Sequence, residues 1–186
     1  MTNAALFLDR DDTLVYDDGY MSRPDQMRLL PGVAEALSKA AARFRLYLVT
    51  NQSGIGRGYY TLAEAEACNR RLLELLALPG GGFSGICIAP EIPEAPSKYR
   101  KPSPAFLTET IERDGLDKTR CYMIGDKTSD LECGLNAGVE AILVGKGVGA
   151  PRTDAAAFAA AHGMRAFRTL PEAIDAVIGL ATGTDN

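Results

Sequence analysis

The feature that most constrains this chain is an alternation of short apolar runs with longer amphipathic stretches. Largely apolar runs cover residues 4–8, 44–50, 83–89, 121–125 and 141–144, and stretches with helical periodicity separate them. Runs this short are typical of strands buried on both faces, and their alternation with helices is typical of a parallel sheet with right-handed crossovers. We therefore predict an α/β fold, a three-layer sandwich with a central parallel sheet and helices on both sides.

Local signals predict where the helices begin. Residues 61–64, Thr-Leu-Ala-Glu, and 129–132, Ser-Asp-Leu-Glu, have the spacing of a capping box. Ser103 precedes a proline, which suits an N-cap followed by the first helical position. The Ala-rich segment 151–186 predicts a terminal helix pair.

Composition limits the classes of function to consider. The 186 residues, 46% of them hydrophobic, suit a single domain over residues 1–186 whose motifs lie within about 4–145. The formal net charge of -4 gives no general attraction to nucleic acids, and no apolar run is long enough for a membrane span. Because the first residues lack the basic and apolar regions of a signal peptide, we expect a cytoplasmic protein.

Cysteine and histidine give no sign of a metal site or of histidine catalysis. The four cysteines lie far apart, without the paired spacing of metal ligands, so we expect free thiols. The only histidine, His162, lies in the Ala-rich segment, far from the polar clusters described below. Acid–base chemistry in this chain is therefore expected to depend on carboxylates.

The first acidic cluster follows the first apolar run directly. Residues 9–13 read Asp-Arg-Asp-Asp-Thr, and acids two apart in an extended chain can point to the same side. Two facing carboxylates repel each other unless a cation lies between them, and oxygen ligands of this kind suit Mg²⁺. On its own, the pattern also fits a solvated acidic loop.

A second acidic cluster follows the fourth apolar run and enters a helix. Asp126 and Asp130 lie four residues apart, so they can share a face. The alternative interpretation is acidic helix capping, which Asp130 fits better than Asp126 because Asp126 precedes the predicted cap.

Polar segments also close the second apolar run and precede a later helix. Residues 50–54 read Thr-Asn-Gln-Ser-Gly, and residues 100–101 read Arg-Lys. Because the carboxyl ends of parallel strands meet at one edge of a sheet, Asp9, Thr50 and Asp126 should converge there. Together these segments supply metal ligands, donors for phosphate oxygens and a fixed cation.

The order of these motifs resembles the haloacid dehalogenase (HAD) superfamily of phosphotransferases over about residues 4–145. More narrowly, the chain is similar to the D-glycero-D-manno-heptose 1,7-bisphosphate phosphatases and the related histidinol-phosphate phosphatases. The resemblance implies a HAD-like Rossmannoid sandwich without a large cap domain, since the chain has no long insertion that could build one. The similarity rests on residues 7–11, 17–20, 49–55, 100–102 and 124–127.

The resemblance also implies roles for individual acids. Asp9 is the expected nucleophile, which forms an aspartyl-phosphate, and Asp11 is the expected general acid and base. Asp9, the backbone carbonyl of Asp11 and Asp126 are the expected Mg²⁺ ligands. Asp130 is expected to orient Lys127 or a metal-bound water rather than to bind the metal directly.

Further residues are expected to contact the substrate by the same resemblance. Thr50 and Lys101 should hydrogen-bond the oxygens of the transferring phosphoryl group. Residues 54–60 suit either a mobile rim that offers Arg57 to a second phosphate or an ordinary Gly-rich connection. The other expected contacts are Asp17, Asp18, Gly19, Tyr20, Asn51, Gln52, Ser53, Arg100 and Lys127.

The sequence departs from the family pattern in two places. Asp12 stands where the family usually has glycine; aspartate tolerates left-handed backbone, but its charge can alter metal affinity or rate. The zinc-loop ligands of many heptose bisphosphate phosphatases are replaced, in our alignment, by Ala89, Glu91, Ser97 and Tyr99. We therefore expect no structural zinc, and a loop stiffened by prolines in its place.

These features predict a Mg²⁺-dependent phosphomonoesterase for a small phosphorylated sugar. The favoured reaction converts D-glycero-D-manno-heptose 1,7-bisphosphate to heptose 1-phosphate, in precursor supply for lipopolysaccharide or capsule. We expect a monomer or weak homo-oligomer that binds neither nucleic acid nor membrane. Histidinol-phosphate phosphatase is the alternative within this class. A polynucleotide 3'-phosphatase, a phosphorylation-switched receiver domain and a non-catalytic descendant are more distant alternatives, the first disfavoured by the acidic charge balance.

Overall fold

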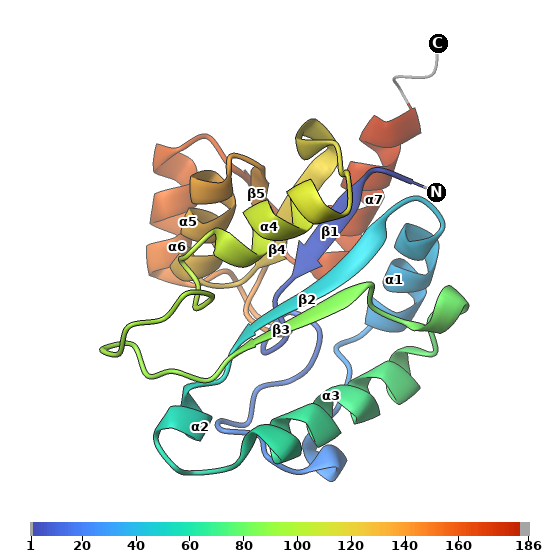
Figure 1. The fold of residues 1–186 in the computed structure, drawn as a ribbon. Coiled ribbons are helices and arrows are strands. Elements are labelled where there is room, and N and C mark those ends of the chain that lie inside the picture. Colours follow the sequence, from blue (N-terminus) through green and yellow to red (C-terminus); the bar gives the residue numbers. More distant parts are fainter. Residues whose placement is uncertain (1, 183–186) are drawn as a thin grey trace.

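The computed structural model describes residues 2–182 as three layers, with helices on both faces of a parallel sheet (Figure 1). Within these residues the strand order is β3-β2-β1-β4-β5-β6, and every neighbouring pair is parallel. The strands are β1 (Ala5–Leu8), β2 (Arg45–Asn51), β3 (Gly85–Ala89), β4 (Cys121–Gly125), β5 (Glu140–Leu143) and β6 (Arg165–Ala166). The helices are α1 (Val33–Ala41), α2 (Ser53–Gly56), α3 (Leu62–Leu76), α4 (Ala105–Arg113), α5 (Thr128–Ala137), α6 (Thr153–Ala161) and α7 (Leu170–Thr182), with short 3-10 helices at Pro24–Gln26, Pro79–Gly81 and Lys118–Arg120.

Side-chain alternation along the central strands divides the apolar core between the two faces of the sheet. In β1, Leu6 and Leu8 pack into the core under α1, α3 and α7, whereas Ala5 and Phe7 pack under α4 and α5. A third group of apolar side chains lies between β5 and helices α5 and α6. All four β1 residues are fully buried, which explains why this strand reads as an uninterrupted apolar run.

The predicted α/β sandwich is confirmed, and the sheet order explains how the polar strand ends meet. Strand β1 pairs with both β2 and β4, and the backbone N–H of Asp9 donates to the carbonyl of Ile124 over 3.0 Å. The order reverses at β1, so the crevice outside the carboxyl ends of β1 and β4 is where a ligand binds in such sheets. Asp9 and Asp126 are the residues that follow these two strands.

Three local expectations differ from the structure. Helix α4 has Pro104 rather than Ser103 at its N-cap, although the Ser103 hydroxyl still accepts from the N–H of Ala105. Helix α5 begins at Thr128, because the Asp130 carboxylate reaches back to the N–H of Lys127 and closes the first turn earlier than the Ser129 cap would. The segment after Pro151 contains two helices, but the short strand β6 lies between them and extends the sheet beside β5.

The long connections between strands build no separate cap within residues 2–182. Residues 9–32 contain turns and one short 3-10 helix, and residues 90–104 contain turns and bends. Within the same described part of the chain, no helix has the length and apolar character needed to cross a bilayer.

Asp114 should make stability depend on pH in the acid range. Its carboxylate accepts hydrogen bonds from Arg113 over 2.9 Å and from the Tyr47 hydroxyl over 2.6 Å, which lowers its pKa to about 2. An acid with a lowered pKa stabilises the fold above its unfolded-state pKa of 3.8, and this contribution is lost as the pH falls through about 2. After allowance for solvent screening, we expect about 1 kcal/mol.

Urea unfolding of the wild type and of Asp114→Asn between about pH 5 and pH 2 measures this contribution. The free energy of unfolding of the wild type should fall faster with decreasing pH than that of the variant. Parallel pH profiles would contradict the assignment.

Candidate active site

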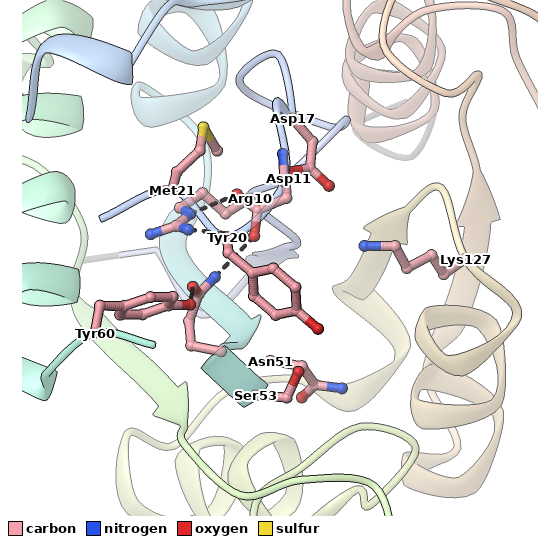
Figure 2. Close-up of a pocket in the computed structure, with 11 residues that line it drawn as sticks. Arg10, Asp11, Asp17, Tyr20, Met21, Asn51, Ser53, Tyr60 and Lys127 are labelled. Carbon is pink, nitrogen blue, oxygen red and sulfur yellow. Dashed lines mark hydrogen bonds and ion pairs between the residues drawn. The ribbon is translucent and has the colours of Figure 1, made fainter. Parts of the chain in front are cut away.

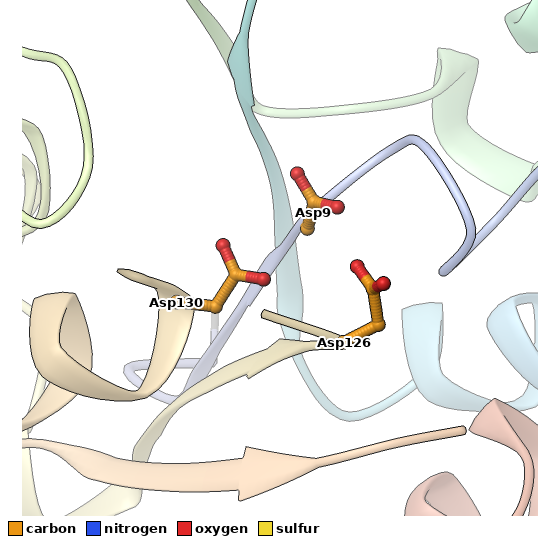
Figure 3. Close-up of side chains that lie close together, drawn as sticks. All are labelled: Asp9, Asp126 and Asp130. Carbon is orange, nitrogen blue, oxygen red and sulfur yellow. The ribbon is translucent and has the colours of Figure 1, made fainter. Parts of the chain in front are cut away.

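Three buried carboxylates meet at the carboxyl edge of the sheet. Asp9 follows β1, Asp126 follows β4 and Asp130 lies in the first turn of α5, and their side chains point toward one another (Figure 3). One carboxylate oxygen from each lies within 4.8 Å of the others, and the three residues are at most 3% exposed. Asp130 can approach so closely because Gly125 has no Cβ, which would otherwise occupy the space of that carboxylate.

Lys101 lies between two of these carboxylates. Its ammonium is 2.5 Å from Asp9 Oδ1 and 2.7 Å from Asp130 Oδ1, and it also donates to the carbonyl of Val49 over 2.8 Å. Burial opposes the charge of Lys101, but Asp130 and Asp9 outweigh that penalty and raise its pKa above the usual value. Burial likewise disfavours ionised Asp9, yet Lys101 and Lys127 hold the pKa of Asp9 below its usual value. Asp9 is therefore an ionised carboxylate in a dry site.

Asp126 has one carboxylate oxygen free for a cation. Arg152 Nε donates to Asp126 Oδ2 over 2.6 Å, whereas the buried Oδ1 has no hydrogen-bond partner among the described residues. Burial, followed by the neighbouring charge of Asp9, raises the pKa of Asp126 to about 7. An unpartnered carboxylate oxygen that faces two further acids fits a divalent cation with oxygen ligands, so the donor set suits Mg²⁺.

Asp11 faces away from the three carboxylates, toward a polar network. Arg10 Nε donates to Asp11 Oδ1 over 2.8 Å, and the Gln52 amide donates to Asp11 Oδ2 over 2.7 Å. Gln52 is in turn held by the Tyr60 hydroxyl, which donates to Gln52 Oε1 over 2.5 Å, and Gln52 Nε2 also lies 2.7 Å from Thr50 Oγ1. The network fixes the direction of the Asp11 carboxylate.

A cavity of about 260 Å³ adjoins these residues (Figure 2). Lys127 reaches toward it from the β4–α5 turn, while Asp11 and the residues after β2 lie across from it. Burial lowers the pKa of Lys127, but Asp9, Asp126 and Asp130 raise it more, so the lysine carries a charge at the cavity wall. The lining residues are Arg10, Asp11, Asp17, Gly19, Tyr20, Met21, Asn51, Gln52, Ser53, Tyr60 and Lys127.

The residues expected to contact a ligand divide into two groups. Seven of them line the cavity, as the preceding list shows, and Thr50 lies buried behind Gln52. Asp18 and Arg100 are not among its lining residues: Asp18 is exposed and pairs with Arg28, and Arg100 Nη1 donates to the carbonyl of Glu91. Asp18 is thus paired with a cation in this structure, and Arg100 is anchored through one of its guanidinium nitrogens.

Hydrogen bonds hold the loop in which our alignment places the replaced zinc ligands. Ser97 Oγ donates to Glu91 Oε2 over 2.7 Å and accepts from the N–H of Arg100 over 3.0 Å. Glu91 and Ser97, two of the residues that our alignment places at the zinc-ligand positions, are thus hydrogen-bonded to each other. The lack of structural zinc stays a prediction.

Several residues at this site were not found from the sequence. Arg10 is fully buried between Asp11 and Asn69, and its position between two acids at residues 9–11 could have indicated an ion pair. Tyr60 is the last residue of the segment 54–60, for which the sequence suggested either a mobile rim of the site or a Gly-rich connection. Arg152 lies in the tail, and no spacing or periodicity links it to Asp126, because only the packing of the tail brings the two together.

Asp130 contacts two lysine residues, and its expected role in orienting Lys127 or a metal-bound water stays a prediction. Its carboxylate contacts the Lys101 ammonium and the backbone N–H of Lys127, not the Lys127 side chain. The cluster as a whole offers a carboxylate that favours its ionised form, a set of oxygens that suits a divalent cation and two lysines, with a cavity beside it. This arrangement suits transfer of a phosphoryl group, because cations and donors surround the space where anionic charge would lie.

Comparison with known proteins finds relatives among the phosphatases of the HAD-like hydrolases. The HAD-hydrolase-like family model matches residues 98–173. The chain is 40% identical over 141 residues to D-glycero-beta-D-manno-heptose-1,7-bisphosphate 7-phosphatase of Helicobacter pylori strain J99, covering 75% of this chain and 81% of that protein. It is 34% identical over 177 residues to the protein of the same name from Pasteurella multocida, covering 91% and 96%.

A solved structure is similar over almost the whole chain. The D,D-heptose 1,7-bisphosphate phosphatase from B. bronchiseptica, complexed with magnesium and phosphate, superimposes with a TM-score of 0.81 at 27% identity. The match covers 94% of this chain and 98% of that one.

Proposed function

The chain belongs to the HAD-like heptose bisphosphate phosphatases, and from this premise we propose that it removes the 7-phosphate of D-glycero-D-manno-heptose 1,7-bisphosphate with Mg²⁺. The observation that carries the proposal is the contact of Asp9 with Lys101 beside Asp126, next to a cavity lined by charged and hydroxyl-bearing side chains. The relatives' names supply the substrate, and the cluster supplies the chemistry.

Mg²⁺ would be held by Asp9, the backbone carbonyl of Asp11 and Asp126, with Asp130 close by. When bound, the ion supplies positive charge between the attacking carboxylate and the phosphate, which would otherwise repel each other. The free Oδ1 of Asp126 supports this assignment. Asp130 already has the Lys101 ammonium as its partner and is better suited to position that lysine than to bind the ion.

Asp9 is the proposed nucleophile. Its carboxylate is ionised and buried, so it attacks phosphorus without first losing a hydration shell. Lys101 donates to Asp9 over 2.5 Å, and its other protons face Asp130 and the carbonyl of Val49. It would orient the nucleophile and supply positive charge beside the phosphoryl group, and it would bond a phosphoryl oxygen directly by exchanging one of these partners. Thr50 Oγ1 is a further proposed donor at the same strand end.

Asp11 is the proposed general acid and base. It would protonate the leaving alkoxide and later take a proton from the water that hydrolyses the aspartyl-phosphate. Its carboxylate borders the cavity and is held by Arg10 and Gln52. To reach the leaving oxygen, the side chain must turn from this network toward the substrate, so the network sets the resting position of the acid.

The rest of the sugar would occupy the cavity. Asn51, Ser53 and Lys127 offer donors to it from two sides, and Tyr20 offers an aromatic face and a hydroxyl (Figure 2). Asp17 and Gly19 border the same space, and Gln52 reaches it through the Asp11 network. The proposal for Arg100 and Asp18 requires a rearrangement, because Glu91 and Arg28 hold them in this structure.

Phosphate release with Mg²⁺ from a substrate panel tests the proposed function. The panel contains the α and β anomers of heptose 1,7-bisphosphate, heptose monophosphates, histidinol phosphate and a 3'-phosphorylated oligonucleotide. We expect the bisphosphates to react with the highest kcat/KM and to leave heptose 1-phosphate. Preference for histidinol phosphate would overturn the substrate but keep the chemistry, and turnover of none would overturn the function.

The setting of the reaction is part of the proposal. We propose a cytoplasmic supply of heptose for lipopolysaccharide or capsule, and a monomer or weak homo-oligomer. Sedimentation of the purified full chain at micromolar concentration measures the oligomeric state.

Tyr60→Phe should lower kcat about fivefold and leave KM nearly unchanged. Loss of the hydroxyl removes the bond that orients Gln52, and one neutral hydrogen bond contributes about 1 kcal/mol. Steady-state kinetics measure the effect, with Tyr59→Phe as the matched control because Tyr59 is 61% exposed. Equal kcat values for both variants would argue against a role of this network in the reaction.

A further inference from the structure

Asp12 and Arg152 form a charge pair at the edge of the carboxylate cluster. Arg152 Nη2 donates to Asp12 Oδ2 over 3.0 Å, while Nε of the same guanidinium donates to Asp126 Oδ2 over 2.6 Å. The arginine thus bridges a proposed metal ligand and the residue that replaces the family's glycine. We propose that Arg152 positions Asp126 for the metal, and that Asp12 neutralises Arg152 so that the arginine does not repel the cation.

Arg152 leaves one oxygen of the Asp126 carboxylate available. Arg152 occupies Oδ2, so only Oδ1 stays available, and that oxygen is buried without a partner. A carboxylate held by one oxygen presents the other in a fixed direction, as partners behind metal ligands commonly do. Arg152 comes from the N-cap of α6, far along the chain, so it is a positioning residue that the C-terminal segment supplies.

Arg152 also brings a positive charge to the edge of the cluster. A guanidinium that touches a metal ligand places a positive charge beside a site for a divalent cation, and like charges in a partly buried site weaken binding. The Arg152 side chain is 29% exposed and that of Asp12 only 8%, so solvent screens this pair little. Asp12 supplies one negative charge to the guanidinium, which leaves the acids of the cluster to the cation.

The backbone at residue 12 has an unusual conformation. Asp12 has φ of 62°, a left-handed conformation that glycine adopts more readily than any other residue. The turn is held by the Asp12 N–H, which donates to the Val15 carbonyl, and by the Gly147 N–H, which donates to the Asp12 carbonyl. Aspartate is one of the few other residues that tolerate this conformation, and from it the Asp12 carboxylate reaches Arg152, with Lys146 3.9 Å away.

This inference rests on the proposed function, because it presupposes that Asp126 binds Mg²⁺. Isothermal titration calorimetry of Mg²⁺ into the metal-free full chain, without substrate, tests it. The variants are Asp12→Asn, which keeps the shape and tolerates the backbone but removes the charge, and the double variant Asp12→Asn with Arg152→Met. Asp154→Asn is the matched control, because Asp154 is an acid near Arg152 whose partner is Thr128.

We expect Asp12→Asn to raise the Mg²⁺ dissociation constant about tenfold, since it leaves the arginine charge uncompensated. The double variant should bind at least about threefold more tightly than Asp12→Asn, because the repelling charge is gone. It should still bind more weakly than the wild type, because Asp126 has lost the bond that directs it. A residue that only supported folding would not show this rescue. The control should stay within about twofold of the wild type.

Two results would overturn the inference while the proposed metal site stands: an Asp12→Asn variant that binds Mg²⁺ as the wild type does, or a double variant as weak as the single one. Asp9→Asn serves as the variant with a damaged metal site. If the wild type bound Mg²⁺ no better than this variant, both the proposed metal site and this inference would be overturned.

Discussion

Replacing Asp9 by Asn should lower phosphate release by at least on the order of 10³-fold without unfolding the protein. Asparagine has nearly the same shape but no charge, so it cannot form the phosphoenzyme, and it gives a metal ion a weaker ligand. The fold should tolerate the change, because Lys101 keeps Asp130 and the carbonyl of Val49 as partners. The loss should therefore appear in kcat, with little change in the melting temperature.

Steady-state phosphate release and circular dichroism on the same preparation measure both quantities. Asp25→Asn is the matched control: Asp25 is an exposed acid paired with Arg23, outside the cluster. An Asp9→Asn variant with wild-type turnover and an intact fold would end the proposed mechanism, whichever sugar phosphate is the substrate.

The sequence predicted the centre of this site because strand ends carry positional information. Parallel strands buried on both faces read as continuous apolar runs, so the first polar residue after each run marks the carboxyl edge. Asp9 and Asp126 follow β1 and β4, and Thr50 lies at the end of β2, next to β1. Their convergence therefore needed only the strand assignment and the topology.

The orientation of side chains could not be predicted in the same way. Asp11 lies two residues from Asp9, but its carboxylate bonds to Arg10 and Gln52 instead of facing the three-acid cluster. The turn after β1 breaks the extended conformation on which the two-residue alternation depends. The two-residue spacing predicts the direction of a side chain only within a strand, and Asp11 lies after the strand has ended.

The contacts that Arg152 makes from the C-terminal segment could not be predicted from the sequence either. Residues 151–186 carry few polar patterns, and the chain between Asp126 and Arg152 contains a helix, a strand and a turn. The two side chains meet only because α6 packs beside α5 and β5. The sequence shows that Asp12 departs from the family pattern, but only the packed structure shows that Arg152 is its partner.

Lys101→Met should cause the largest combined loss of activity and stability. Methionine keeps most of the length of the side chain, but it leaves Asp9, Asp126 and Asp130 together in a dry site without the lysine cation between them. Removing one partner of a buried ion pair costs about 3 to 5 kcal/mol. Loss of a fixed cation beside the nucleophile and the phosphoryl group should also lower kcat on the order of 10²-fold to 10³-fold.

The stability loss should depend on Mg²⁺, and this dependence separates electrostatics from packing. A divalent cation bound by Asp9 and Asp126 replaces part of the missing positive charge, so Mg²⁺ should raise the melting temperature of Lys101→Met more than that of the wild type. Lys98→Met is the matched control, because Lys98 is an exposed lysine paired with Glu109 rather than with any of the three carboxylates. If Lys101→Met melted like the wild type with and without Mg²⁺, repulsion among the three carboxylates would not be what Lys101 balances.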